Sequence, residues 1–288
     1  MGTAQVNDIT LGYDDTEGPE GPPLLLVHGH PFDRTMWRPQ VRAFGRRRVI
    51  APDLRGYGRS TVVPGSSPLE AFAGDLAALL DCLGVDRAVV CGLSMGGQIA
   101  LEFHRLFADR VAGLVLADTS AQAETEQGRT ERRTRAAQLE REGMIGYSYE
   151  VLESMVGPAT VREVPAVADH VLGMMLAAPP AGAAAALRGR AERPDYTEML
   201  AEIAVPTLVM VGREDAFTPV SDAEFLHERI PGARLTVVEG AGHMPNLERP
   251  TVFNAAVAAL LADVIEAPED AQDAQDAEEA PCTADATA

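Results

Sequence analysis

Short runs of apolar residues alternate with amphipathic stretches over residues 1–120. The runs are rich in valine, leucine and isoleucine, which is typical of strands that are buried on both faces of a parallel sheet. The strands predicted in this way are Leu24–Val27, Val49–Ala51, Ala88–Cys91 and Val111–Ala117. This alternation of strand and helix predicts βαβ units, and therefore an α/β fold with a parallel sheet.

The same pattern predicts the other elements of this part of the chain. Two alternating segments within 5–13 predict a hairpin at the edge of the sheet. A helix over 69–83 follows a serine–proline start and ends at a glycine. Further helices are predicted over 36–44 and from Gln98 onward, where apolar residues recur at helical spacing.

Between 121 and 202 the pattern changes, because helical stretches follow one another without a candidate strand. The predicted helices cover 129–141, 144–155, 166–176 and 183–191. We interpret this segment as a helical insertion that lies over the sheet as a lid or cap, not as a second globular core.

The strand pattern resumes after the insertion, with strands at Thr207–Val211 and Leu235–Val238 and helices over 220–230 and 251–265. The end of the chain carries seven acidic residues and no large hydrophobic residue, so it is predicted to be a disordered, solvating tail. The predicted division is a first core part at 1–120, a cap insertion at 121–202, a second core part at 203–266 and an acidic tail at 267–288.

A glycine-rich turn joins the strand at 88–91 to the helix that follows it. The turn reads Gly92-Leu93-Ser94-Met95-Gly96-Gly97 and contains G-x-S-x-G, the nucleophile elbow. Such a turn holds the serine in a strained conformation, and its glycines permit the strand and the helix to approach closely. We therefore predict that Ser94 is a catalytic nucleophile.

A serine hydroxyl needs a general base, and the base needs a carboxylate that orients it. Asp215 and His243 each follow a predicted strand, in the chain order serine, acid, histidine that this elbow arrangement uses. Because the carboxyl ends of parallel strands share one edge of the sheet, these two residues and Ser94 are expected to meet there. Asp118, which also follows a strand, is the reserve candidate for the acid.

The other histidines and one further acid receive structural interpretations. His104, His170 and His227 lie on predicted helices, His28 is expected to brace a loop, and the loop that begins at Asp53 reads as structural.

Acyl transfer also needs two N–H donors that bind the developing oxyanion. The N–H of Met95, at the start of the helix after Ser94, is the first predicted donor. The N–H of His30, in the loop after the strand Leu24–Val27, is the second. Gly29 and Pro31 shape that loop.

Composition excludes several classes of function. The net charge is −19 and all 24 basic residues are arginine, so Schiff-base chemistry on lysine is excluded. The acidic balance opposes binding to nucleic acids and anionic membranes. We find no metal-binding motif, no nucleotide-binding loop, no apolar run long enough for a membrane span and no signal peptide. We therefore expect no cofactor and no metal.

The three cysteines make no disulfide framework, which fits a reduced, cytoplasmic setting. The expected partner is a small-molecule substrate, and a homodimer is left open.

Together these motifs, with His28-Gly29-His30-Pro31, Gly212–Asp215 and Gly240–His243, resemble the α/β-hydrolase superfamily over about residues 5–265. The chain is similar to cofactor-free carboxylesterases, 3-oxoadipate enol-lactonases and non-haem haloperoxidases or perhydrolases. The resemblance implies a mostly parallel, eight-stranded sheet flanked by helices, a cap formed by the insertion, and an acyl-enzyme on Ser94. Many relatives have histidine at the position of Leu93.

The leading hypothesis is a serine hydrolase that cleaves a small carboxylic ester or lactone. The alternatives are a specialised pathway hydrolase, acting on an enol-lactone or a C–C bond, and a small-molecule receptor that kept the triad. Several residues are candidates for an apolar substrate pocket under the cap, although each is also typical of ordinary packing. They are Trp37, Tyr147, Met155, Met174 and Met175.

Overall fold

In the computed structural model, which describes residues 1–266, eight strands form one sheet in the order β1-β2-β4-β3-β5-β6-β7-β8. β1 and β2 form an antiparallel hairpin, β2 pairs antiparallel with β4, and all later pairs are parallel. The α/β fold predicted from the apolar runs is confirmed. The strands are β1 (Gly2–Val6), β2 (Ile9–Asp15), β3 (Leu24–Val27), β4 (Val49–Pro52), β5 (Ala88–Leu93), β6 (Val111–Ala117), β7 (Thr207–Gly212) and β8 (Arg234–Val238).

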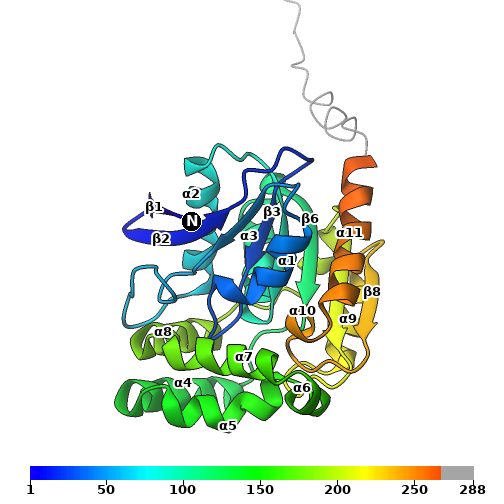
Figure 1. The fold of residues 1–288 in the computed structure, drawn as a ribbon. Helices are drawn as coiled ribbons and strands as arrows, with labels where there is room; N and C mark the ends of the chain where they lie inside the picture. Colours follow the sequence, from blue (N-terminus) through cyan, green and yellow to red (C-terminus); the bar gives the residue numbers. More distant parts are fainter. Residues whose placement is uncertain (267–288) are drawn as a thin grey trace, which may run out of the picture.

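Helices cover both faces of the sheet, and each face has its own apolar core (Figure 1). Within β3, Leu25 and Val27 belong to the core with α2, α3 and α9, whereas Leu24 and Leu26 belong to the core with α1 and α11. Burial on both faces explains why the strands read as continuous apolar runs. These helices are α1 (Arg38–Ala43), α2 (Leu69–Cys82), α3 (Met95–Leu106), α9 (Val220–Arg229), α10 (Pro245–Glu248) and α11 (Pro250–Glu266).

Five helices between β6 and β7 lie together across one end of the sheet, drawn in green in Figure 1. Four of them match the predicted helices of the insertion closely. The short α6 was not predicted, because it is too brief to show a periodic apolar pattern. The five are α4 (Glu126–Glu142), α5 (Ile145–Met155), α6 (Pro158–Glu163), α7 (Pro165–Ala177) and α8 (Pro180–Ala191).

Within the described residues, no single helix is long and apolar enough to cross a membrane. The pair α7 and α8, bent by 93°, passes that test of length and composition only when the two are taken together. The predicted acidic tail at 267–288 lies outside the described residues.

Two glycines allow α8 to lie directly on the loops of the core. A Cβ on Gly182 would lie 2.0 Å from the carbonyl oxygen of Gly56, and one on Gly189 would lie 1.7 Å from that of Ser67. The N–H of Ser67 also donates to the carbonyl of Ala185 at 3.0 Å. This close backbone contact fixes α8, and therefore Arg190 near its end, against the edge of the sheet that carries Ser94.

Candidate active site

Ser94 lies in the tight turn between β5 and α3, with φ 57° and ψ −116°. This left-handed conformation is strained for a residue with a side chain and is typical of functional sites. A Cβ on Gly92 would lie 2.0 Å from the carbonyl oxygen of Gly96, and one on Gly96 would lie 2.0 Å from that of Val27. Only glycine fits at either position, so the strand and the helix can approach closely enough to form the turn.

His243 and Asp215 form a buried hydrogen-bonded pair at the ends of β8 and β7. The Nδ1 atom of His243 lies 2.7 Å from Oδ2 of Asp215. The same carboxylate accepts the N–H of Phe217 at 2.8 Å and the hydroxyl of Thr218. Burial alone would raise the pKa of Asp215, but His243 and these hydrogen bonds outweigh it and lower the pKa. Asp215 is therefore ionised and holds the imidazole ring in one orientation.

Asp118, the reserve acid, lies beside this pair at the end of β6. It is fully buried and also has a positive φ, 47°. Its Oδ1 accepts the N–H of Gly212 at 2.9 Å, while Oδ2 has no hydrogen-bond partner among the described residues. Burial and the adjacent charge of Asp215 raise the pKa of Asp118 well above its usual value. We therefore interpret Asp118 as a neutral carboxylic acid next to the ionised Asp215.

Asp118, Asp215 and His243 also form the one group of three potential metal ligands within residues 1–266, with ligand atoms inside 4.8 Å. The nitrogen of His243 that faces the acids is engaged by Asp215, and Gly212 occupies one oxygen of Asp118. We interpret this group as a hydrogen-bonded acid–histidine pair with a neighbouring acid.

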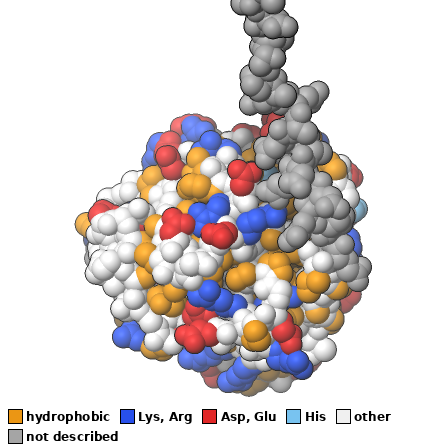
Figure 2. Space-filling view, turned by 90° about the horizontal axis from the view of Figure 1, so that it is seen from above, with side chains coloured by type: hydrophobic (Ala, Val, Ile, Leu, Met, Phe, Trp, Pro, Cys, Tyr) orange, Lys and Arg blue, Asp and Glu red, His pale blue; other side chains and the backbone are white. Residues whose placement is uncertain are grey.

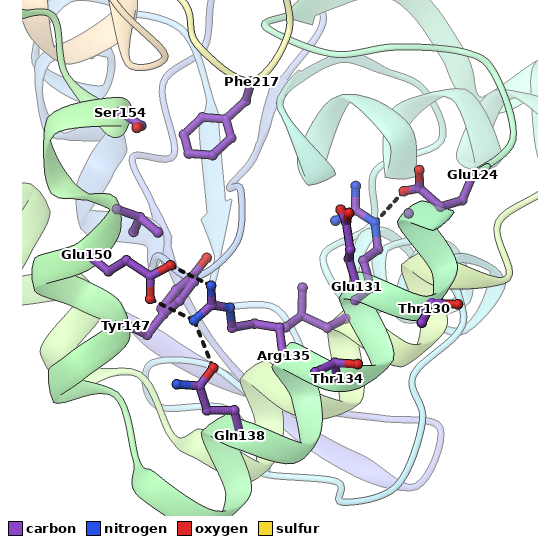
Figure 3. Close-up of a pocket in the computed structure, with 14 residues that line it drawn as sticks. Glu124, Thr130, Glu131, Thr134, Arg135, Gln138, Tyr147, Glu150, Ser154 and Phe217 are labelled. Atoms are coloured by element: carbon purple, nitrogen blue, oxygen red, sulfur yellow. Dashed lines mark hydrogen bonds and ion pairs between the residues drawn. The ribbon is translucent and has the colours of Figure 1, made fainter. Parts of the chain in front are cut away.

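Ser94 and His243 line the same cavity, which has a volume of about 360 Å³. The ring of Phe217 lies edge-on to that of His243, with 5.0 Å between ring centroids. A larger outer chamber of about 680 Å³ adjoins this cavity between α4 and α5, and the two share Tyr147 and Phe217 in their walls (Figure 3). There, Arg135 donates to both oxygens of Glu150 and lies over the ring of Tyr147. The outer chamber and the cavity at Ser94 therefore adjoin at these shared side chains.

The structure divides the predicted pocket residues into two groups. Tyr147 and Met155 line the cavity at Ser94. Trp37, Met174 and Met175 are buried in the core on the α11 face and lie outside the residues that line this cavity. The ring of Trp37 packs on Phe253, with 6.1 Å between the ring centroids. We therefore assign these three side chains to packing, the reading that the sequence also allowed.

The two predicted oxyanion donors lie beside Ser94. Met95 begins α3, and the first N–H groups of a helix have no partner within it. His30 lines the cavity, and a Cβ on its neighbour Gly29 would lie 3.4 Å from Cβ of Ser94. The loop after β3 and the start of α3 therefore both lie next to Ser94, and the assignment of the two N–H groups as oxyanion donors stays a prediction.

His28 has the bracing role that the sequence predicted for it. Its Nδ1 donates to the carbonyl of Gly29 at 2.9 Å, and its Nε2 accepts the N–H of Leu54 at 2.9 Å. Both ring nitrogens are thus occupied by backbone groups. This fixes the loop after β3 relative to the loop after β4.

One wall of the cavity carries arginines that sequence reasoning missed. Arg132 and Arg193 both donate to Oε2 of Glu124, and Arg190 donates from Nε to Gln98 at 3.0 Å. The signal in the sequence was weak, because Arg132 and Arg190 lie on helices whose pattern does not indicate which side faces Ser94, and Arg193 follows the end of α8. Only Gln98 could have been predicted to line the cavity, because it lies one helical turn after Ser94.

Replacing Glu124 with glutamine should lower the free energy of unfolding at pH 7 by about 1–3 kcal/mol, because Arg132 and Arg193 lose their shared carboxylate. Burial would raise the pKa of Glu124, but the hydrogen bonds of Arg193 and Arg132 lower it from 4.5 to about 2. The stabilisation is therefore complete above pH 4.5 and is lost as the pH falls toward 2. Urea unfolding at pH 7 and pH 3 measures it, and an equal difference between the two proteins at both pH values would contradict this assignment.

Comparison with known proteins agrees with this architecture. Residues 24–256 match the model of the Alpha/beta hydrolase family. The chain is 30% identical over 261 residues to 3-oxoadipate enol-lactonase 2 of Acinetobacter baylyi. The aligned region covers 90% of this chain and 96% of that protein.

Two solved structures have the same fold. A thermophilic esterase from Thermogutta terrifontis, solved with malate bound, has a TM-score of 0.86 at 42% identity and covers 89% of this chain and 94% of its own. The enol-lactonase from Burkholderia xenovorans LB400 has a TM-score of 0.83 at 29% identity and covers 91% of this chain and 100% of its own. The chain therefore belongs to the alpha/beta hydrolase family, as its elbow and strand-end motifs predicted.

Proposed function

We propose that this protein is a serine hydrolase that cleaves small carboxylic esters or lactones through an acyl-enzyme on Ser94. One observation carries the proposal: the strained Ser94 lines the same cavity as His243, and His243 is hydrogen-bonded to the buried Asp215. The esterase and enol-lactonase relatives support the choice of ester and lactone bonds. The malate bound by the esterase supports a small, polar substrate.

In the proposed first half-reaction, Oγ of Ser94 attacks the carbonyl carbon and His243 takes the hydroxyl proton at Nε2. The N–H groups of Met95 and His30 bind the resulting oxyanion. Asp215 stabilises the imidazolium through its hydrogen bond to Nδ1. When the intermediate collapses, the bond to the alkoxide breaks and His243 donates its proton to the leaving alcohol.

The second half-reaction repeats these steps with water. His243 takes a proton from the water while the oxygen attacks the acyl carbon, and the bond to Ser94 then breaks with return of the proton to Oγ. The products are a carboxylic acid and the regenerated serine. With a lactone the alcohol and the acid are parts of one molecule, so a hydroxy acid, or its keto tautomer from an enol-lactone, leaves the site.

In this proposal the helical insertion acts as a cap. It closes the cavity over Ser94 and leaves the outer chamber between α4 and α5 as the entrance. A closed site excludes bulk water and strengthens the electrostatic interactions within it.

A fluorophosphonate probe should label the protein at Ser94 within minutes, because an activated hydroxyl displaces fluoride from phosphorus while His243 takes the proton. Mass spectrometry of the digested protein should locate the adduct on the peptide that contains Ser94. The same preparation should hydrolyse p-nitrophenyl acetate.

Tight binding of a small molecule without labelling or turnover would favour the receptor alternative. Turnover of an enol-lactone or a C–C bond, with none of simple esters, would favour the specialised pathway hydrolase.

A further inference from the structure

The guanidinium group of Arg190 lies in the wall of the Ser94 cavity without a carboxylate partner. The residue is 8% exposed, and its Nε donates to the neutral amide oxygen of Gln98. Among residues 1–266 it forms no ion pair, whereas Arg132 and Arg193 nearby share Glu124. Of the three arginines that line the cavity, Arg132 and Arg193 are therefore paired with Glu124 and Arg190 is not; Asp118 and Asp222, which also line the cavity, form no ion pair with it.

An unpaired buried charge is costly, and this one is kept in a protein whose fold pairs most of its other buried arginines. Arg34 is paired with Asp53 and Arg193 with Glu124, whereas the buried Arg47 donates to the carbonyl oxygen of Pro22. Burial, together with the charges of Arg132 and Arg193, lowers the pKa of Arg190 well below its ordinary value. A bound anion would offset both the cost of burying the charge of Arg190 and its repulsion from Arg132 and Arg193.

Arg190 lines the same cavity as Ser94. Gln98, its hydrogen-bond partner, donates its N–H to the carbonyl of Ser94 at 3.1 Å and so lies one helical turn, roughly 5.4 Å along the axis, from it. Because Arg190 and Ser94 line one cavity of about 360 Å³, a small molecule with its carbonyl at Ser94 can also place a second group at Arg190. On the face shown in Figure 2, acidic and basic side chains are interspersed, whereas three arginines gather in the lining of the cavity.

The side chain of His30 supplies a second polar group in the same cavity. Its Nδ1 lies 2.7 Å from the hydroxyl of Tyr57, while its buried Nε2 has no partner within the described part of the chain. Burial and the charge of Arg190 lower the pKa of His30, so the ring is neutral. When Nδ1 accepts the phenolic hydrogen, Nε2 carries the ring proton and is free to donate it to an acceptor.

We propose that Arg190 binds a carboxylate of the substrate, so that the preferred substrates are short esters or lactones that carry a free carboxylate a few bonds from the scissile carbonyl. The planar guanidinium group matches a carboxylate in two parallel hydrogen bonds. Nε2 of His30 donates to the same carboxylate or to an adjacent oxygen. This proposal rests on the proposed function, because it assigns a substrate class to that site.

Two methyl esters of nearly identical shape test it: monomethyl succinate, which carries a carboxylate, and methyl succinamate, in which an amide replaces it. In the wild type, kcat/KM for monomethyl succinate should be at least about 10-fold higher than kcat/KM for methyl succinamate. Arg190→Gln should lower that value by about 10- to 100-fold and change the value for the amide by less than about 3-fold. Arg46→Gln, a surface variant with the same change in charge, should leave both values unchanged.

Arg190→Lys keeps the positive charge and should retain part of the preference for monomethyl succinate over methyl succinamate. This result would separate recognition of the carboxylate from a loss of folding. Hydrolysis of both esters by the wild type with equal kcat/KM values would overturn the proposal, and that comparison needs no variant. An equal loss on both esters in a folded Arg190→Gln protein would overturn it as well.

Binding measured without turnover separates this proposal from the proposed function. Calorimetric titration of Ser94→Ala with monomethyl succinate should show binding that weakens at least about 10-fold in Ser94→Ala/Arg190→Gln. If the wild type hydrolyses neither ester but this difference in binding is found, the proposed function fails and the carboxylate site stands. If the two variants bind equally, the carboxylate site is overturned whatever the rates of hydrolysis are.

Discussion

Ser94→Ala should reduce kcat for hydrolysis of p-nitrophenyl acetate by about 10⁵-fold, to within a few powers of ten of the uncatalysed rate. The variant loses the nucleophile and, with it, the acyl-enzyme route through which His243 and Asp215 act. What remains is catalysis by the oxyanion donors and by substrate binding. Initial rates of p-nitrophenol release, measured with enough enzyme to detect a 10⁵-fold loss, check this value.

A second buried serine provides the control for this variant. Ser148 on α5 donates its hydroxyl to the carbonyl of Met144 at 2.8 Å and lies outside the residues that line the cavity. Ser148→Ala removes the same atom and should change kcat by less than about 3-fold, at a cost of about 1 kcal/mol in stability. A Ser94→Ala protein that keeps more than about a hundredth of the activity would contradict the nucleophile assignment.

The fold and the position of the elbow could be predicted because each depends on local rules. Strands buried on both faces must be continuously apolar, as Leu24–Val27 is. The turn at Ser94 needs glycine at Gly92 and Gly96, since a Cβ at either place would meet backbone atoms. Topology then brings Asp215 and His243 to the same edge, because the carboxyl ends of parallel strands share it.

The composition of the cavity could not be predicted, because it depends on how the insertion lies on the core. Arg190 lies near the end of α8, which is mostly alanine and glycine, so no apolar stripe shows which side of the helix faces Ser94. Contacts that involve only backbone atoms at Gly182 and Gly189 decide its orientation. The prediction that Trp37 and Met175 line the pocket was wrong, because large apolar side chains are suited to a core as well as to a pocket and these two lie in the core.

The choice between the two acids is of the same kind. Asp118 and Asp215 both follow strands, and both come close to His243, so spacing alone leaves the reserve candidate open. Hydrogen bonding separates them: Nδ1 of His243 lies 2.7 Å from Asp215, which also accepts Phe217 and Thr218, whereas Oδ2 of Asp118 has no partner among the described residues. These contacts stabilise a negative charge on Asp215 and leave Asp118 neutral.

Asp215→Asn should therefore reduce kcat by about 10³- to 10⁴-fold, whereas Asp118→Asn should reduce it by less than about 10-fold. An amide at 215 can donate to Nδ1 of His243, which favours the tautomer that cannot accept a proton from Ser94, and it no longer stabilises the imidazolium. An amide at 118 replaces a carboxyl group that is already neutral, with nearly the same shape. Initial rates of the two variants on one ester compare the acids directly. If Asp118→Asn instead causes the larger loss, then Asp118 carries the charge that His243 needs, and the hydrogen bond to Asp215 is only structural.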